Sequence, residues 1–114
     1  MSMEVLFAGV RVRDLGTATE WYSRLFGREP DIVPNDDEVM WRVTDGAWLY
    51  VIRDAPRSGN SLVTISVSDL EEAAAELADR NIELGPIAAV GDEARKAKGQ
   101  DPEGNSVDLI QVTQ

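Results

Sequence analysis

Few residue types in this chain can do chemistry. It has no histidine and no cysteine, which removes the commonest acid–base group near neutral pH, the thiolate nucleophile and the usual ligands of transition metals. A general base in this chain would therefore have to be a carboxylate or an activated tyrosine. Any metal ion would need oxygen ligands.

A second group of candidate functional residues is aromatic. Trp41, Trp48 and Tyr50 fall in two predicted strands that are joined by Asp45-Gly46, a strong signal for a two-residue hairpin turn. That turn predicts that Trp41 lies opposite Tyr50, because directly opposed residues share a face of a sheet. We therefore expect the three aromatic side chains on one face.

The elements that must position these residues occur twice. The string Val10–Leu15 returns in similar form as Ile65–Leu70. Each copy reads as a strand that ends at an aspartate, Asp14 or Asp69, which is a favourable helix N-cap. Most of the chain therefore looks like one module present in two copies.

Hydrophobic periodicity predicts the same order in each copy: strand, helix, strand, strand, strand. The first module covers about residues 3–54, the linker 54–61 and the second module about 62–114, within a single domain. The predicted strands are 3–12, 30–34, 38–44, 47–53, 62–67, 84–90, 94–100 and 106–112, and the predicted helices are 15–26 and 70–80. The sequence thus predicts an α+β fold of two tandem βαβββ modules.

The composition limits the partners. A net charge of −10 argues against nucleic acids and anionic membranes, which require a basic surface. It suits a cationic ligand, although acidity can also serve solubility alone. No run approaches the roughly 20 apolar residues of a membrane span, and the start of the chain lacks the pattern of a secretory signal. We expect a cytoplasmic location.

At this point the chain resembles the vicinal oxygen chelate superfamily, which includes glyoxalase I, extradiol dioxygenases and bleomycin-resistance proteins. The resemblance depends on Val10–Leu15 followed by Glu20–Gly27, on the echo at Ile65–Leu70, and on Asp101–Asn105 before Val107–Leu109. It implies that the two modules form a curled mixed sheet, shaped as a cup and often completed by dimerisation.

The resemblance also implies where a metal ion would bind. In metal-using relatives the ligands lie early on the first strand and on the fourth strand of each module, which correspond here to Phe7, Leu62, Tyr50 and Asp108. Phe7 and Leu62 cannot bind a metal, and one carboxylate with a phenol does not hold a catalytic divalent ion. We therefore expect no metal and no cofactor.

Strand alternation places the candidate ligand-binding residues on one sheet surface. This aromatic and apolar surface with one carboxylate suits a planar or amphipathic small molecule. The alternatives are that the aromatic side chains only fill the gap between two half-sheets, and that Asp108 only pairs with Arg11 or Lys98. The predicted ligand-binding residues are Phe7, Arg11, Trp41, Trp48, Tyr50, Leu62, Thr64 and Asp108.

Three functions remain open. The first is a metal-independent binding protein of the bleomycin-resistance type, a homodimer that sequesters an aromatic or cationic small molecule. The second is a metal-independent isomerase or lyase with Asp108 or Tyr50 as general base. The third is an interaction module whose cup is filled by its own side chains or by a partner subunit.

Overall fold

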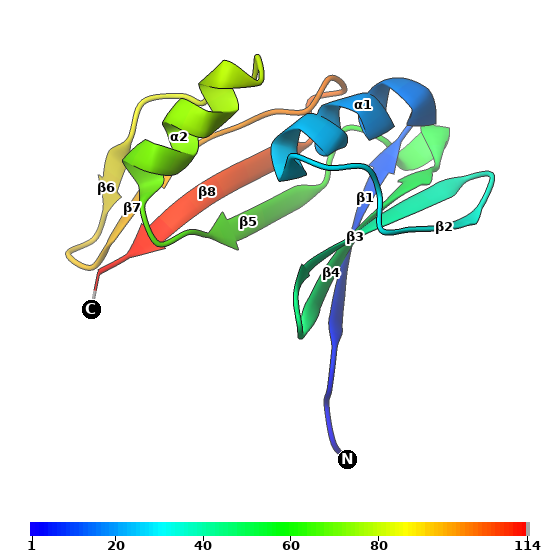
Figure 1. Cartoon of the computed structure of the whole chain (residues 1–114), viewed down its shortest axis with the longest axis horizontal. Helices are drawn as coiled ribbons and strands as arrows, with labels where there is room; N and C mark the ends of the chain where they lie inside the picture. Colours follow the sequence, from blue (N-terminus) through cyan, green and yellow to red (C-terminus); the bar gives the residue numbers. More distant parts are fainter. Residues whose placement is uncertain (114) are drawn as a thin grey trace.

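The computed structural model describes residues 1–113. Figure 1 shows two helices on the same side of two sheets, each sheet with its own helix. The elements are β1 Leu6–Val12, α1 Leu15–Phe26, β2 Ile32–Asn35, β3 Glu38–Thr44, β4 Ala47–Arg53, a 3₁₀ turn η1 Ala55–Arg57, β5 Leu62–Ser66, α2 Leu70–Asp79, β6 Ala88–Val90, β7 Ala94–Ala97 and β8 Ser106–Val112.

The two sheets repeat one topology. The first has the strand order β1-β4-β3-β2 and the second β5-β8-β7-β6. In each module the first and last strands run parallel, and the last three strands form an antiparallel meander. The prediction of an α+β fold with two βαβββ modules is confirmed, while the predicted end of the second module, residue 114, lies outside the described residues.

The predicted helix boundaries agree with the structure. The side chain of Asp14 accepts a hydrogen bond from Thr17 N, and this bond holds the pKa of Asp14 below its usual value. Gly27 ends α1 in the left-handed conformation, with φ 72°, that favours glycine. Asp69 caps α2 in the same way as Asp14 caps α1. Neither helix within the described residues has the length and apolar character needed to cross a membrane.

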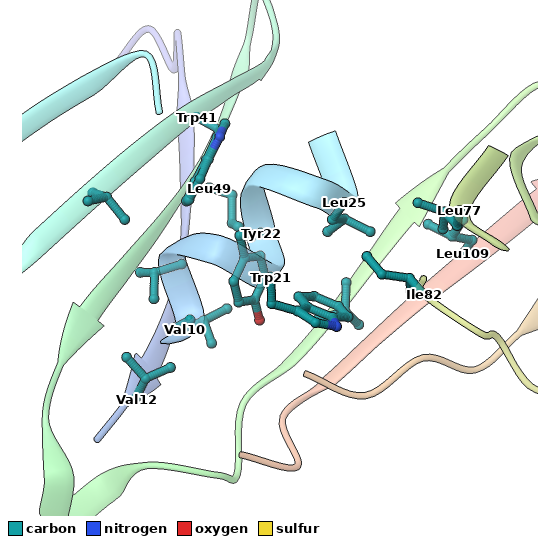
Figure 2. Close-up of a cluster of buried hydrophobic side chains, with 14 of the residues drawn as sticks. Val10, Val12, Trp21, Tyr22, Leu25, Trp41, Leu49, Leu77, Ile82 and Leu109 are labelled. Atoms are coloured by element: carbon teal, nitrogen blue, oxygen red, sulfur yellow. The ribbon is translucent and has the colours of Figure 1, made fainter. Parts of the chain in front are cut away.

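One hydrophobic core extends across both modules. It includes Val10 and Leu49 of the first sheet and Leu77 and Leu109 of the second module. Figure 2 shows Trp21 and Leu25 of α1 on the side of the helix that faces the second module, where Leu77, Ile82 and Leu109 lie. Trp21 is thus a packing residue.

Arg24 and Arg80 each donate hydrogen bonds to the C-terminal end of the opposite helix. Arg24 Nη1 donates to the backbone oxygens of Arg80 and Asn81, each at 3.2 Å. In turn, Arg80 Nη1 donates to the oxygens of Arg24 at 3.2 Å and Leu25 at 3.3 Å. Each guanidinium therefore satisfies carbonyls at the C-terminus of the opposite helix, where a positive charge is favourable.

The turn between β7 and β8, residues 101–105, locks the modules together. The buried carboxylate of Asp101 accepts the hydroxyl of Tyr22 at 2.9 Å and the amide of Asn105 at 2.8 Å. Burial, followed by the charge of Asp101, raises the pKa of Tyr22 well above its ordinary value. Glu103 accepts hydrogen bonds from the backbone N–H groups of Arg13 and Asp14 at the start of α1. A turn from the second module therefore caps the helix of the first.

The predicted position of Trp41 is wrong. Thr44 pairs with Ala47 as expected, but a β-bulge at Val43 shifts the register, so that Trp41 lies opposite Leu49 instead of Tyr50. A shift of one residue moves a side chain to the other face of the sheet. Trp41 therefore lies beneath α1 and is fully buried.

The contacts of Trp41 show why the core retains it. Its ring centroid lies 6.0 Å from that of Tyr22 and 5.5 Å from that of Phe26. Its Nε1–H donates to the backbone oxygen of Arg28 at 3.1 Å. A buried tryptophan needs such a partner for its N–H, so this position satisfies both its apolar and its polar atoms.

The largest boundary difference is in the second module. The predicted strand 84–90 shortens to β6, Ala88–Val90, and Leu84 and Ile87 lie outside this strand, packed against the hydrophobic core. Similarly, the predicted strand 94–100 ends at Ala97.

Candidate functional site

The face of each sheet opposite its helix, here called the helix-free face, carries most of the predicted site residues. In the first sheet the parallel register places Phe7 beside Trp48 and Gly9 beside Tyr50. These side chains alternate with buried residues such as Val10 that point towards α1. The helix-free face therefore carries the aromatic surface that the sequence predicted, without Trp41.

The aromatic part of this face is a stacked pair. The rings of Phe7 and Trp48 lie 6.3 Å apart with an interplanar angle of 23°. Phe7 is 52% exposed, and Trp48 is half-buried. An exposed pair of parallel rings presents a flat apolar surface for another planar group.

Tyr50 continues this surface along the strands. Its ring lies directly over Gly9: a Cβ atom at Gly9 would lie 2.5 Å from Tyr50 Cζ. Glycine at this position is therefore what permits the tyrosine to lie flat across β1.

Beyond Tyr50 a hollow of about 340 Å³ contains the charged groups of the first module. Arg11 Nε lies 3.2 Å and Arg57 Nε 2.9 Å from the same oxygen of Asp54, Oδ2. Asp54 is mostly covered, while both arginines are largely exposed. This cavity, here called the Tyr50 hollow, is lined by Gly9, Arg11, Tyr50, Ile52, Asp54 and Arg57.

The second module has a more polar helix-free face. Leu62 and Thr64 are exposed on β5, and Thr64 lies beside Asp108 of β8. Asp108 does form an ion pair, but its partner is Lys96 rather than Arg11 or Lys98, which were the alternatives considered: its Oδ2 lies 3.2 Å from Lys96 Nζ. Lys96 reaches it from β7, where it lies opposite Ile110, two residues from Asp108 on the same face.

Asp108 is a buried carboxylate with one partner on each oxygen. Only 4% of the residue is exposed. Its Oδ1 accepts a hydrogen bond from Gly99 N at 3.3 Å, and its Oδ2 takes the lysine. It lines a second hollow of about 510 Å³, here called the Asp108 hollow, together with Glu83, Gly85, Lys98, Gly99, Gln100 and Ser106.

The structure does not bring Tyr50 and Asp108 into one cavity. The Tyr50 hollow and the Asp108 hollow have no lining residue in common. Tyr50 and Asp108 therefore line two separate open hollows rather than a single enclosed cup.

Two other hollows offer less chemistry. One of about 600 Å³ lies along the outer side of α1 and has no aromatic lining residue. A smaller one of about 240 Å³ lies between the two helices, where Phe26, Ile65 and Leu77 give it an apolar lining.

The side chains at the positions of the relatives' metal ligands do not suit a metal ion. Phe7 and Leu62 present only carbon atoms, and both oxygens of Asp108 already have partners. Among residues 1–113, no three carboxylate side chains come together as a group that could hold an ion. Hard cations require several oxygen ligands, and this arrangement does not supply them.

Sequence reasoning missed three members of the site. Arg57 and Asp54 lie in the predicted linker, and the single 3₁₀ turn η1 brings them into contact. Lys96 lies in a basic run that gave no indication of its buried partner. Alternation along strands finds residues within a strand, but it does not place a linker side chain over the sheet.

Comparison with known proteins adds the following. The chain shares 31% of its residues with a glyoxalase/bleomycin resistance protein from Catenulispora acidiphila, whose crystal structure superposes with a TM-score of 0.88 over 96% of this chain and 98% of the other. No family model matches the sequence, and no curated protein matches it.

Two more distant structures share the fold. One is an antibiotic binding protein from a Streptomyces species, with 21% identity, a TM-score of 0.77 and 96% coverage of both chains. The other is a lactoylglutathione lyase from Agrobacterium tumefaciens, with 16% identity and a TM-score of 0.78 over 96% of this chain and 94% of the other.

Proposed function

Because the chain belongs to the glyoxalase/bleomycin resistance protein family, within the vicinal oxygen chelate superfamily, we propose that it is a cytoplasmic protein that binds and sequesters a small aromatic molecule without a metal ion. The observation that carries this proposal is the stacked pair of Phe7 and Trp48, which is exposed on the helix-free face and continues into Tyr50. A flat aromatic surface next to polar groups is a usual form of ligand site.

The donor set supports the proposed metal independence. The residues at the relatives' ligand positions are Phe7, Leu62, Tyr50 and Asp108, and of these only Asp108 offers a carboxylate. That carboxylate pairs with Lys96. Binding by aromatic stacking requires none of these groups to hold an ion.

An antibiotic is a suitable class of ligand. A structural relative is an antibiotic binding protein, and many antibiotics carry planar aromatic rings that would stack on Trp48. A cationic ligand was expected from the net charge, but it would have to compete with Lys96 for Asp108 and with two arginines for Asp54. The geometry favours aromatic recognition over recognition of a positive charge.

We further propose that the protein acts as a homodimer. Phe7 and Leu62 lie on the helix-free faces of the two sheets and are 52% and 68% exposed, and exposed large apolar side chains often mark an interface. A second subunit placed over these residues would enclose the open hollows. Light scattering at micromolar concentration should give twice the chain mass; a monomer mass would refute this part.

The enzymatic alternative has less support. A general base must reach the substrate, but Asp108 is only 4% exposed and is paired with Lys96. Tyr50 lines its hollow and remains the better candidate. Binding of an aromatic ligand with no turnover is therefore the result that we expect.

Isothermal titration calorimetry in the presence of a chelator tests the proposal. A panel of polyaromatic and glycopeptide antibiotics should include ligands whose affinity falls at least about tenfold in Trp48→Ala. The control is Val33→Ala, which truncates an exposed apolar side chain, 63% exposed, on β2. The proposal fails if no compound binds, or if both variants weaken binding equally.

A further inference from the structure

The Tyr50 hollow is positively charged in a strongly acidic protein. Two guanidinium groups, from Arg11 and Arg57, meet the single carboxylate of Asp54, which leaves one net positive charge in a chain with a net charge of −10. We propose that this hollow binds the carboxylate of a planar aromatic acid, an inference that rests on the proposed function and names its ligand class.

The arginines retain donors for such a ligand. Both contact Asp54 through Nε, and within residues 1–113 neither guanidinium donates a hydrogen bond to another part of the protein. An arginine carries four more N–H groups on its terminal amino nitrogens, in a planar fork that matches a carboxylate. The side chains of Arg11 and Arg57 are 47% and 71% exposed, so a ligand in the hollow can reach them.

Asp54 has the role of positioning these two groups. Its side chain is only 18% exposed, and its contacts draw together an arginine from β1 and an arginine from η1. Without Asp54, the two positively charged guanidinium groups would repel each other. A ligand carboxylate would add a second negative charge and balance the pair.

The aromatic surface runs directly into this charged end. Along β1 and β4 the neighbouring pairs are Phe7 with Trp48, Gly9 with Tyr50, and Arg11 with Ile52. Four residues of extended strand separate Phe7 from Arg11, a distance of roughly 13 Å. A ligand with two aromatic rings and a terminal carboxylate has this length, with its rings on Phe7 and Trp48 and its acid group at the arginines.

The charge favours a carboxylate over its alternatives. A cationic head group would meet two guanidinium groups and one carboxylate that is already paired. A phosphate dianion would exceed the single net positive charge of the hollow. A singly charged, planar oxyanion fits both the charge and the geometry of the arginine fork.

Three biphenyl probes that differ only in their head group test the inference. By calorimetry at low salt, biphenylcarboxylate should bind at least about tenfold more tightly than biphenylmethanol, with biphenylmethylammonium the weakest. In the double variant Arg11→Gln/Arg57→Gln this preference should disappear, while the affinity for biphenylmethanol changes by less than about twofold. Higher salt should reduce the preference, because exposed charges are screened.

The control is Arg53→Gln. It removes one positive charge from β4, but its side chain lies on the opposite face from Tyr50 and pairs with Asp37. It should retain the full preference for the carboxylate. Equal binding of all three probes, tighter binding of the ammonium, or loss of preference in Arg53→Gln would overturn this inference and leave the proposed function intact. If no probe binds, this inference fails, and the antibiotic panel decides separately whether the proposed function stands.

Discussion

Asn105 provides the strongest test of how the two modules are held together. Its side chain is fully buried in the turn before β8. The amide nitrogen donates to Arg11 O at 3.1 Å and to Asp101 Oδ2 at 2.8 Å, and the amide oxygen accepts from Ser61 N at 2.8 Å. One side chain thus joins β1, the linker and the turn of the second module.

Asn105→Ala should lower the free energy of unfolding by about 2–4 kcal/mol. Each lost hydrogen bond contributes about 1 kcal/mol, and a buried group left without a partner costs about 1–3 kcal/mol. The expected loss of unfolding free energy is smaller than the sum of these contributions, because Asp101 retains its hydrogen bond from the hydroxyl of Tyr22 and water can reach the exposed Arg11. For a domain of this size the melting temperature should fall by roughly 8–15 °C.

Circular dichroism during thermal and urea denaturation measures this effect. The control is Asn60→Ala, because Asn60 is exposed and its amide makes only a 3.5 Å contact with Ser58 O; its change should be under about 0.5 kcal/mol. Asn105→Asp should destabilise more than alanine, because it places an oxygen against the carboxylate of Asp101. Equal melting of the Asn105→Ala and Asn60→Ala variants would refute the role of Asn105 as a lock.

Three further predictions concern pH and packing. Burial raises the pKa of Tyr22, so the stabilisation by its neutral hydroxyl is complete below pH about 10 and is lost above it. In urea denaturation, Tyr22→Phe should be less stable than the wild type at neutral pH, and the two should converge above pH 10. Parallel curves of stability against pH would contradict this. Arg95 lowers the pKa of Glu71 to about 2, so their ion pair stabilises the fold above pH about 4.5, and this stabilisation is lost as the pH falls towards 2. In Glu71→Gln the melting temperature should depend less on pH between about 4.5 and about 2. An unchanged dependence would refute this. Gly9→Ala should displace Tyr50, since the added Cβ would lie 2.5 Å from Cζ, and weaken aromatic ligands severalfold with little change in melting temperature; unchanged affinity would show that Tyr50 is not part of the site.

Local signals in the sequence were sufficient for the helices and most strands. Asp14 and Gly27 mark both ends of α1, because a capping carboxylate and a left-handed glycine act within a few residues. The same is true of Asp45-Gly46, which correctly set the bounds of β3 and β4. These predictions needed no knowledge of tertiary contacts.

The register beyond the hairpin turn was not predictable in this way. The bulge at Val43 places Trp41 under α1, where Tyr22 and Phe26 surround it. Alternation alone gives no sign of one extra residue in a strand. The register that buries Trp41 is favoured by the free energy of packing its large ring against α1, which is distant in the sequence.

The role of the turn at residues 101–105 was also only partly visible. Its proline, glycine and asparagine are typical of a turn, and the segment forms one. Its contacts with Tyr22 and the start of α1 cross from the second module to the first, and sequence spacing does not encode such distances. Likewise, the linker residue Arg57 joins the site only because of where η1 lies in the fold.

The indole N–H signals of the three tryptophans in an NMR titration give the most direct test of the central claim. With a chelator present and biphenylcarboxylate as the ligand, the signal of Trp48 should move, because this ring is half-exposed on the helix-free face. The signals of Trp41 and Trp21 should stay in place, because both rings are buried in the core. A shift confined to Trp41 or Trp21, or none at Trp48 while the ligand binds, would contradict the account.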